Sequence, residues 1–299
     1  MEQPIRTGFI GLGAMGAGMA ANLLRANVSL VVFDPNPTAV AKLTASGAES
    51  AATAAEVASR VERLFLCLPF APEVREVLFA DNGVIHGMHK NLHIVDCTTL
   101  VHSDALAIAQ QSTEHGLLYN DCPISGGPGR AADGSLSIMF GGEQAQFDSV
   151  RVLLGHMGED IIHCGALGSG QLMKAINNVI YDINIAALCE LLPLAIKAGL
   201  DANTVASIVT SASSRSFASD MFVPKIMDRK FEGDFPMQSA WKDIVNVQEI
   251  AVRYGAMTPV TNAMTAVYQS AMAQGHGAEP KSAMIKIYEK VLGVEVQRS

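Results

Sequence analysis

The 299-residue sequence predicts an α/β domain with a mainly parallel sheet, followed by an all-helical domain, with a long helix joining the two. The first half alternates short apolar or β-branched runs with Ala-rich segments, which is typical of strand–helix–strand crossover units. Beyond residue 165 no convincing strand pattern follows, and residues 170–196 form one long apolar segment with only three charges. Because the length is about twice that of a usual single domain, we expect two domains, at 1–165 and 166–299.

The elements follow from these patterns in order along the chain. The expected strands are Ile5–Ile10, Leu30–Phe33, Leu64–Leu68, His93–Val95, Leu136–Phe140 and Ile161–His163. The expected helices between them are Met15–Ala26, Pro37–Ser46, Glu73–Phe79 and Ser103–His115. The segment from Gly170 to Ile196 is apolar on nearly every side, so we expect it to be buried on nearly every side, between domains or at a subunit interface.

The composition excludes several classes of protein. A chain with 49% hydrophobic and 17% charged residues is not disordered, and a net charge of −8 without a Lys/Arg run argues against a nucleic-acid partner. The charge-free stretch Thr7–Leu24 contains five glycines, which disfavours both a signal peptide and a membrane helix. Five cysteines without a C-x-x-C pair indicate reduced, mostly buried thiols. We therefore expect a cytoplasmic protein without a membrane partner.

A glycine-rich motif lies between the first expected strand and the first expected helix. Its sequence is Gly11-Leu12-Gly13-Ala14-Met15-Gly16. The first glycine permits a tight turn, the second lets the backbone approach a pyrophosphate, and the third allows close packing of strand and helix. Asp34 ends the next strand, where a carboxylate accepts hydrogen bonds from the adenosine ribose. The same carboxylate would repel a 2′-phosphate, and Pro35 and Asn36 offer no cation. The sequence therefore predicts NAD as the cofactor, with NADP as the less favoured alternative.

The ends of later strands supply further candidates. Leu68 and Pro69 follow one strand, and Thr98 and Thr99 follow another. These residues are candidate cofactor contacts, although each pair could be an ordinary strand-end turn. The segment 121–134 is predicted to be a glycine-rich loop. It contains Ser125, Gly126 and Gly127, whose backbone N–H groups can converge on a carboxylate or an oxyanion. The alternative for this segment is a flexible surface loop.

Lys174 and Asn178 are four residues apart near the start of the long apolar helix and therefore share one face. Burial and the helix N-terminus both disfavour a charged lysine, so we expect a lowered pKa that suits a general acid/base. The alternative is a lysine whose head reaches solvent at the helix edge. Lys242 and Asp243 form a second candidate pair, which alone would more often be a solvated ion pair.

The order of these motifs resembles the β-hydroxyacid dehydrogenase family, which contains 3-hydroxyisobutyrate dehydrogenase and tartronate semialdehyde reductase. The resemblance covers essentially the whole chain, and it implies a Rossmann domain, an all-helical domain, an active site in the cleft and a homodimer or homotetramer. It implies that Lys174 is the catalytic acid/base and that Asn178 holds a small carboxylate-bearing substrate. Further implied contacts are Ser125, Gly126 and Gly127 for the substrate carboxylate, Lys242 for substrate and nicotinamide, and Leu68, Pro69 and Thr99 for NAD.

Some features leave alternatives open. The residues Pro128-Gly129-Arg130 depart from the family patterns for both named substrates, and Arg130 would either pair with a second acidic group or face solvent. The C-terminal run 275–296 is closer to tartronate semialdehyde reductases. An imine reductase shares the architecture but usually lacks the lysine, and a non-catalytic dinucleotide-binding module would be expected to lose it. His86, His89 and His93 lack a partner cluster of Cys or carboxylates, so we expect no metal.

Overall fold

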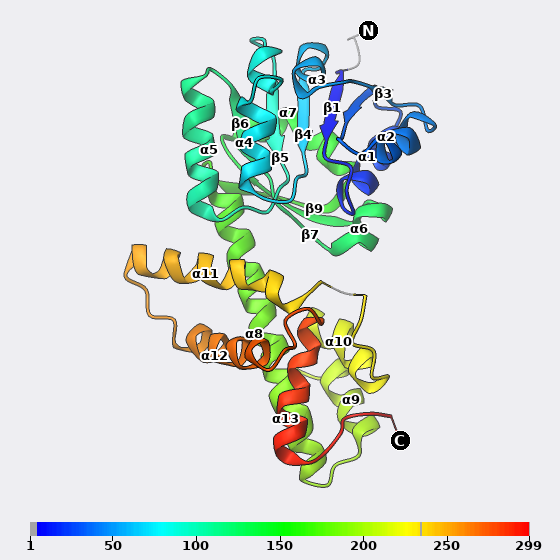
Figure 1. Cartoon of the computed structure of the whole chain (residues 1–299), viewed down its shortest axis with the longest axis vertical. Coiled ribbons are helices and arrows are strands. Elements are labelled where there is room, and N and C mark those ends of the chain that lie inside the picture. The colour runs from blue at the N-terminus through cyan, green and yellow to red at the C-terminus, as the bar shows by residue number, and fades with distance from the viewer. Residues whose placement is uncertain (1–4, 234, 299) are drawn as a thin grey trace. The chain divides into compact units, whose positions relative to one another are not determined.

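The computed structural model describes residues 5–233 and 235–298, and the chain divides into two compact units after Lys174. The division falls inside helix α8 (Ser169–Lys197), the long helix in green in Figure 1. The expected domain boundary at 165/166 stays a prediction, and each unit is described separately below.

The first unit is built on a nine-stranded sheet with the order β3-β2-β1-β4-β5-β6-β8-β7, in which β9 pairs with β8. Strands β1 to β6 are parallel neighbours, whereas β8 is antiparallel to β6 and β7 and parallel to β9. The mainly parallel sheet expected from the sequence is therefore confirmed. The strands are β1 (Thr7–Ile10), β2 (Leu30–Phe33), β3 (Glu49–Ser50), β4 (Arg63–Leu66), β5 (His93–Asp96), β6 (Leu118–Asp121), β7 (Ile124–Ser125), β8 (Leu136–Gly141) and β9 (Gly158–Gly165).

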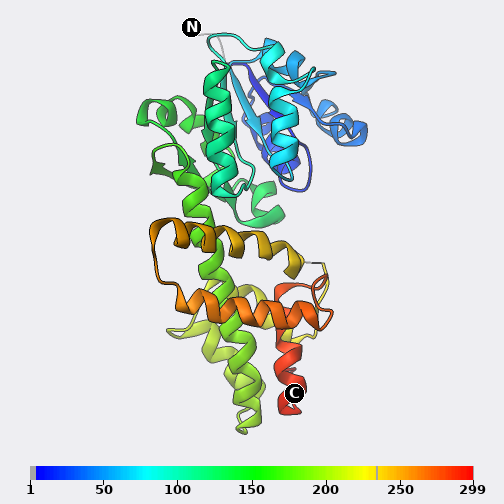
Figure 2. The ribbon, with the colours of Figure 1, turned by 60° about the vertical axis from the view of Figure 1, so that its left-hand side comes forward.

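Two hydrophobic cores lie on the two faces of this sheet, because alternate strand residues point to opposite sides. Phe9 packs in the core with α1 and α7, while the adjacent Ile10 packs in the core with α3, α4 and α5. Figure 2 shows α4 and α5 as two roughly parallel helices in front of the strands. The helices of this unit are α1 (Gly16–Arg25), α2 (Pro37–Thr44), α3 (Ala54–Arg60), α4 (Ala71–Phe79), the short η1 (Val84–His86), α5 (His102–Glu114), α6 (Gly127–Asp133) and α7 (Gln144–Gly155).

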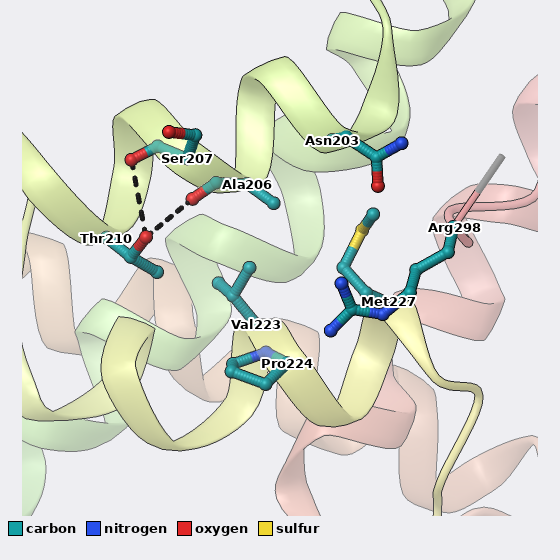
Figure 3. A pocket seen from close by; sticks show the side chains of 8 residues that line it. All are labelled: Asn203, Ala206, Ser207, Thr210, Val223, Pro224, Met227 and Arg298. Carbon is teal, nitrogen blue, oxygen red and sulfur yellow. Dashed lines mark hydrogen bonds between the residues drawn. The ribbon is translucent and has the colours of Figure 1, made fainter.

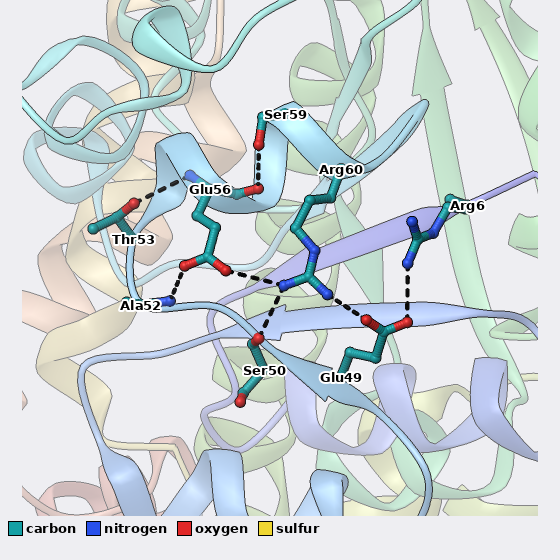
Figure 4. Close-up of polar contacts among 8 residues, drawn as sticks. All are labelled: Arg6, Glu49, Ser50, Ala52, Thr53, Glu56, Ser59 and Arg60. Carbon is teal, nitrogen blue, oxygen red and sulfur yellow. Dashed lines mark hydrogen bonds and ion pairs between the residues drawn. The ribbon is translucent and has the colours of Figure 1, made fainter.

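The edge of the sheet at β3 is tied to α3 by polar contacts. The Thr53 hydroxyl caps α3 by accepting from the backbone N–H of Glu56 at 3.1 Å, and the Glu56 carboxylate accepts from the N–H of Ala52 at 2.8 Å. Arg60, in the last turn of α3, donates to Glu56, to the backbone oxygen of Ser50 and to Glu49 (Figure 4). These contacts explain how a strand of two exposed residues keeps its place at the edge.

Several elements of the first unit were not expected from the sequence. Strands β3, β6 and β7 and helices α3, α6 and α7 are additional to the expected set. The segment 121–134, which we expected to be a glycine-rich loop, contains β7 and the seven-residue helix α6. Pro128 stands in the first turn of α6, where its missing N–H costs no helical hydrogen bond.

The second unit is helical, and its described residues contain no β-strand, as expected. Its core includes Cys189 and Leu192 from α8 together with Phe222, Ile244 and Tyr268 from later helices. The elements that follow α8 are α9 (Ala202–Ser211), α10 (Phe217–Met227), α11 (Met237–Tyr254), α12 (Pro259–Ala273), the short η2 (Lys281–Met284) and α13 (Ile285–Leu292).

Helix α8 matches the expected helix to within one residue at each end, but it is less buried than expected. Five of its large apolar side chains are 42–55% exposed, namely Met173, Ile176, Ile180, Leu191 and Leu194. At 100° per residue these five fall within one stripe about 60° wide, so the exposure is confined to one face. The expectation of burial on nearly every side is therefore wrong for the single chain.

By length and composition alone, α8 is also the one described helix that could cross a membrane. Its most apolar 18-residue window has a mean hydropathy of 1.8 and is 39% buried. This criterion is weak, because core helices of proteins that never enter a membrane satisfy it as well.

All five cysteines are free thiols, as the sequence indicated. Cys67, Cys97 and Cys122 follow immediately after β4, β5 and β6, which are adjacent strands in register. Burial is the main cause that raises the pKa of Cys67, and the pKa of Cys97 is raised first by its hydrogen bond with Cys122 and then by burial. In the helical unit, burial likewise raises the pKa of Cys189.

Candidate functional site

The glycine-rich turn lies between β1 and α1, at the carboxyl edge of the sheet. Gly11 has a φ of 93°, and a Cβ there would lie 2.2 Å from the backbone oxygen of Cys67. At Gly16 a Cβ would lie 1.9 Å from the backbone oxygen of Gly11, so the turn packs directly on the helix. Gly13 differs, because no heavy atom lies within 4 Å of its Cβ position. The turn therefore has a tight inner side and an open side, as a turn that lets a pyrophosphate approach its backbone requires.

Asp34 follows β2 and reaches across to the same turn. One carboxylate oxygen accepts from the backbone N–H of Leu12 at 2.6 Å, and the other accepts from the N–H of Asn36 at 2.8 Å. The side chain is half-buried, so it keeps an accessible side. A second acceptor lone pair on each oxygen remains available for a ribose hydroxyl.

The ends of β4 and β5 are joined through Thr98. Its hydroxyl accepts from the backbone N–H of Leu68 at 3.0 Å, and its own backbone N–H donates to Asp96 at 2.9 Å. Burial raises the pKa of Asp96 to about 6, although hydrogen bonds from Thr98 and from the Tyr119 hydroxyl oppose this shift. Thr99 is half-buried beside this network, and Pro69 is exposed after Leu68. Leu68 and Thr99 thus lie at neighbouring strand ends on one edge.

The candidate substrate segment begins at Ser125, the last residue of β7. Gly126 and Gly127 follow with φ values of 139° and 73°, both in the region that favours glycine. All three residues are half-buried. The helix that they begin, α6, packs on the cofactor helix α1: the amide of Asn22 donates to the backbone oxygen of Ala131 at 2.9 Å. The glycine turn and the candidate substrate segment are therefore connected through the packing of α6 on α1.

Lys174 is 8% exposed and lies in the second turn of α8. Asp121, at the end of β6, anchors the start of this helix: its two carboxylate oxygens accept from the backbone N–H groups of Gly168 at 2.6 Å and Gln171 at 2.8 Å. Burial raises the pKa of Asp121, and these two N–H groups oppose the shift. A carboxylate that accepts the N–H groups at the first turn also complements the helix dipole. The lysine therefore stands on a firmly held helix end.

In the helical unit, Asn178 and α11 meet through a direct hydrogen bond. The Asn178 amide donates to the carboxylate of Asp243 at 2.8 Å, and Asp243 is 7% exposed. Lys242 is the adjacent, half-buried residue on α11. One turn beyond Asn178, Asp182 forms a buried ion pair with Lys281, whose ammonium lies 5.0 Å from the centroid of the Tyr181 ring. Asp243 is thus a structural partner of Asn178 rather than half of a solvated ion pair.

Arg130 is engaged within its own unit. Its guanidinium donates to the Ser135 hydroxyl at 3.3 Å and lies 3.8 Å from Asp160, so part of its charge is compensated there. Among the described residues no group of three or more His, Cys, Asp or Glu side chains could hold a metal ion. His89 and His93 instead contact the backbone oxygen of Val61 and the side-chain oxygen of Asn120.

A cavity of about 260 Å³ in the helical unit contains none of the expected site residues. It lies between α9 and α10, where Figure 3 shows the Thr210 hydroxyl turned back onto its own helix. Its lining residues are Asn203, Ala206, Ser207, Thr210, Val223, Pro224, Met227 and Arg298.

The first unit therefore brings together the glycine turn, Asp34, the ends of β4 and β5, and the anchored start of α8. Asp121, Thr98 and Gln171 are the connecting residues. Thr98 was a candidate cofactor contact, whereas no individual role was predicted for Asp121 or Gln171. Asp121 and Gln171 did carry a signal, since each is a polar residue inside a segment already singled out as a motif. The hydrogen bonds that join them span 50 or more residues of sequence, which no local pattern indicates.

Comparison with known proteins gives two family matches that together cover most of the chain. Residues 6–165 match the NAD binding domain of 6-phosphogluconate dehydrogenase, and residues 168–288 match the NAD-binding domain of NADP-dependent 3-hydroxyisobutyrate dehydrogenase. The chain is 36% identical to 2-(hydroxymethyl)glutarate dehydrogenase of Eubacterium barkeri, with 99% of each chain covered. It is 31% identical to the NAD-dependent L-serine dehydrogenase of Pseudomonas aeruginosa, with 95% of this chain and 98% of the relative covered.

Solved structures support the same family assignment. A 3-hydroxyisobutyrate dehydrogenase from Salmonella typhimurium has a TM-score of 0.83 and 32% identity, with 95% of this chain and 99% of that chain covered. An imine reductase from Myxococcus stipitatus has a TM-score of 0.64 and 18% identity over 96% of this chain and 99% of that chain, which shows the shared fold alone. The relatives are dehydrogenases that act on the CH–OH group of hydroxyacids, and NAD is the cofactor that their matches support. The chain belongs to the β-hydroxyacid dehydrogenase family.

Proposed function

We propose that the chain transfers a hydride between NAD and the primary alcohol carbon of a 2-substituted 3-hydroxypropanoate. The compounds named for the relatives, 2-(hydroxymethyl)glutarate, 3-hydroxyisobutyrate and L-serine, share a CH2OH group next to a carbon that bears a carboxylate. They differ only in the third substituent on that carbon. Glycerate, the reduced form of tartronate semialdehyde, has the same skeleton, so the substrate suggested by residues 275–296 stays within this class.

The observation that carries the proposal is the buried Lys174 on a helix end held by Asp121. Bound NAD would supply the hydride acceptor for the alcohol carbon. In this direction the neutral Lys174 takes the hydroxyl proton as the C–O bond becomes a carbonyl. In the reverse direction its ammonium returns that proton. Both requirements are met by one amine that gains a proton during oxidation or loses one during reduction, and that exchanges this proton with solvent before the next turnover.

Binding is divided among the remaining candidates. Ser125, Gly126 and Gly127 bind the substrate carboxylate, because two successive glycines with positive φ can turn backbone N–H groups toward one anion. Asn178 orients the substrate hydroxyl while Asp243 fixes its amide. Lys242 closes over the substrate and the nicotinamide. Gly11 to Gly16, Asp34, Leu68, Pro69 and Thr99 bind NAD, and the open side of Gly13 supports this assignment.

The test is a spectrophotometric screen for NADH formation with 3-hydroxyisobutyrate, L-serine, glycerate and 2-(hydroxymethyl)glutarate. We expect turnover with at least one of them and not with a 2-hydroxy acid such as lactate, whose alcohol is on the other carbon. Lys174→Ala should lose nearly all of the roughly 10²–10⁴-fold that acid–base catalysis contributes while it still binds NADH. Turnover that survives in this variant would remove Lys174 from the role of base.

We also propose a homodimer or homotetramer in which a second copy covers the exposed stripe of α8. The stripe is apolar from Met173 to Leu194, and by its position on the helix it is opposite the face of Lys174 and Asn178. Helix α9, which follows, has no buried residue although half of it is apolar. A cytoplasmic location remains part of the proposal.

A further inference from the structure

The amide of Gln171 is fully buried and makes two hydrogen bonds to one short segment far away in the sequence. Its nitrogen donates to the backbone oxygen of Thr98 at 2.6 Å, and its oxygen accepts from the backbone N–H of Leu100 at 3.0 Å. These two backbone groups lie on either side of Thr99. The side chain therefore clamps the peptide groups that flank Thr99.

The same residue is also fixed to the helix that carries Lys174. Its backbone N–H donates to Asp121, and its side chain leaves α8 three residues before the lysine. At 1.5 Å per residue the two α-carbons differ by only about 4.5 Å along the helix axis. A change in the Gln171 side chain would therefore change the position of Thr99 relative to Lys174, because no flexible segment lies between Gln171 and Lys174.

We propose that Gln171 is a positioning residue that sets the distance between Thr99, at the nicotinamide side of the cofactor, and Lys174. This inference rests on the proposed function, because it takes Thr99 as a cofactor contact and Lys174 as the base. Gln171 touches neither substrate nor cofactor in this role. It acts by holding Thr99 and Lys174 at a fixed separation, and small displacements of reacting or positioning groups cost a large part of the reaction rate.

The chemistry of the clamp requires an amide. A side chain at this position must donate to Thr98 and accept from Leu100 at once. An ionised carboxylate can only accept, and it would face the Thr98 oxygen without a proton between them. A protonated carboxylic acid can do both, because its O–H donates and its carbonyl accepts.

The first experiment is Gln171→Met, which keeps the length of the side chain and the backbone hydrogen bond to Asp121. We expect kcat to fall by roughly 10- to 100-fold, because a displacement of about 1 Å can cost that much. The dissociation constant of NADH, measured by fluorescence, should change little, because Asp34 and the glycine turn are untouched. Amide exchange at Leu100 should become faster, and this readout does not depend on activity.

The matched control is Gln146→Met, since the Gln146 amide oxygen accepts from the backbone N–H of Glu143 and from Asn120 in the same unit, each at 2.9 Å. It should lower thermal stability without lowering kcat. If Gln171→Met lowers stability but leaves kcat at the wild-type value, Gln171 is merely structural and the proposal is wrong.

Gln171→Glu provides a second test that remains available if the methionine variant does not fold. Burial should raise the pKa of the new carboxyl group, so lowering the pH restores the proton that the clamp needs. We expect the ratio of the kcat of this variant to that of the wild type, measured in the reduction direction, to rise as pH falls. A ratio independent of pH would contradict the proposal. If the wild type turns over no hydroxy acid at all, the proposed function fails, while exchange at Leu100 still decides whether the clamp exists.

Discussion

At the scale of single residues, Asp34 combines two tasks in one carboxylate. It accepts the Leu12 N–H and so shapes the glycine turn, and in the proposed NAD site its charge would repel a 2′-phosphate on the ribose. The first task needs only an acceptor oxygen, whereas the second needs the negative charge. Substitutions can therefore separate the two.

We expect Asp34→Asn to keep an acceptor for Leu12 and to lose the discrimination against NADP. Two unit charges 4 Å apart repel by about 4 kcal/mol at an effective dielectric constant of 20, so the ratio of kcat/KM for NADP to that for NAD should rise by at least about tenfold. Asp34→Ala removes the acceptor as well, and kcat/KM for NAD should fall further. A ratio that stays at the wild-type value in both variants would place Asp34 outside the ribose site.

His93 and Asp96, at the two ends of β5, make opposite contributions to the pH dependence of stability. Burial lowers the pKa of His93 from 6.5 to about 4, so between these values the unfolded chain binds a proton that the folded chain does not. Its contribution to stability is therefore lost as pH falls from 6.5 to 4. Burial raises the pKa of Asp96 from 3.8 to about 6, so in that window the folded chain holds the extra proton and stability falls as pH rises.

Urea unfolding curves of His93→Gln, recorded from pH 7.5 to pH 4, should reveal the contribution of His93 to the pH dependence of stability. Removing the imidazole takes away an acid penalty of up to about 3 kcal/mol, given 1.36 kcal/mol for each pH unit between the two pKa values. The variant should therefore lose less stability on acidification than the wild type. Ser149→Ala, which removes only a neighbouring hydroxyl, should keep the wild-type dependence. Parallel curves for wild type and His93→Gln would mean that His93 stays accessible to protons in the folded chain.

At the scale of elements, the contact between α1 and α6 joins the glycine turn to the segment that we propose binds the substrate. Gly18 makes this contact possible, because a Cβ there would lie 2.8 Å from the backbone of Ala131. Alanine is the better helix former by about 1 kcal/mol, so local propensity and packing point in opposite directions at this position.

Gly18→Ala should displace α6 and raise the KM for the hydroxy acid several-fold, although it favours the helix. Gly155→Ala in α7 is the control, because the Cβ there would meet only the Ile161 side chain at an ordinary 3.7 Å. Steady-state kinetics together with thermal unfolding of both variants tests this. If both variants show the same KM, the packing of α1 on α6 does not position the substrate segment.

The sequence predicted some elements better than others for physical reasons. Strands β1, β2, β4 and β5 are apolar and follow the expected ranges closely, because both faces of a parallel sheet are buried. Strand β6 contains Asn120 and Asp121, which are buried only because distant groups satisfy them, so its sequence does not identify it as a strand. Similarly, the motifs indicated Lys174 and Thr99 as candidate site residues, roles that stay predictions, but they did not indicate the Gln171 amide that connects the two segments.

At the scale of the whole molecule, the two units have separate cores, and α8 contributes to both sides of the division. The large side chains of its apolar stripe are 42–55% exposed in the single chain. If a second copy covers the stripe, one charge placed in it should prevent assembly, because burying an unpaired carboxylate costs several kcal/mol.

Ile180→Glu should therefore convert the wild-type oligomer into a smaller species, measured by light scattering coupled to gel filtration. Val152→Glu introduces the same charge at an exposed apolar residue of α7 and should leave the mass unchanged. A wild-type protein that is already monomeric, or an Ile180→Glu variant with the wild-type mass, would contradict assembly through α8.

The position of the cysteines makes the two units separately observable without any engineered label. Cys97 belongs to the first unit and Cys189 to the second; both are buried, and their raised pKa values disfavour the thiolate that alkylating reagents attack. Only opening of the surrounding core exposes them. Pulsed alkylation followed by peptide mass analysis would thus time the loss of the nucleotide-binding core and of the helical core in a single sample.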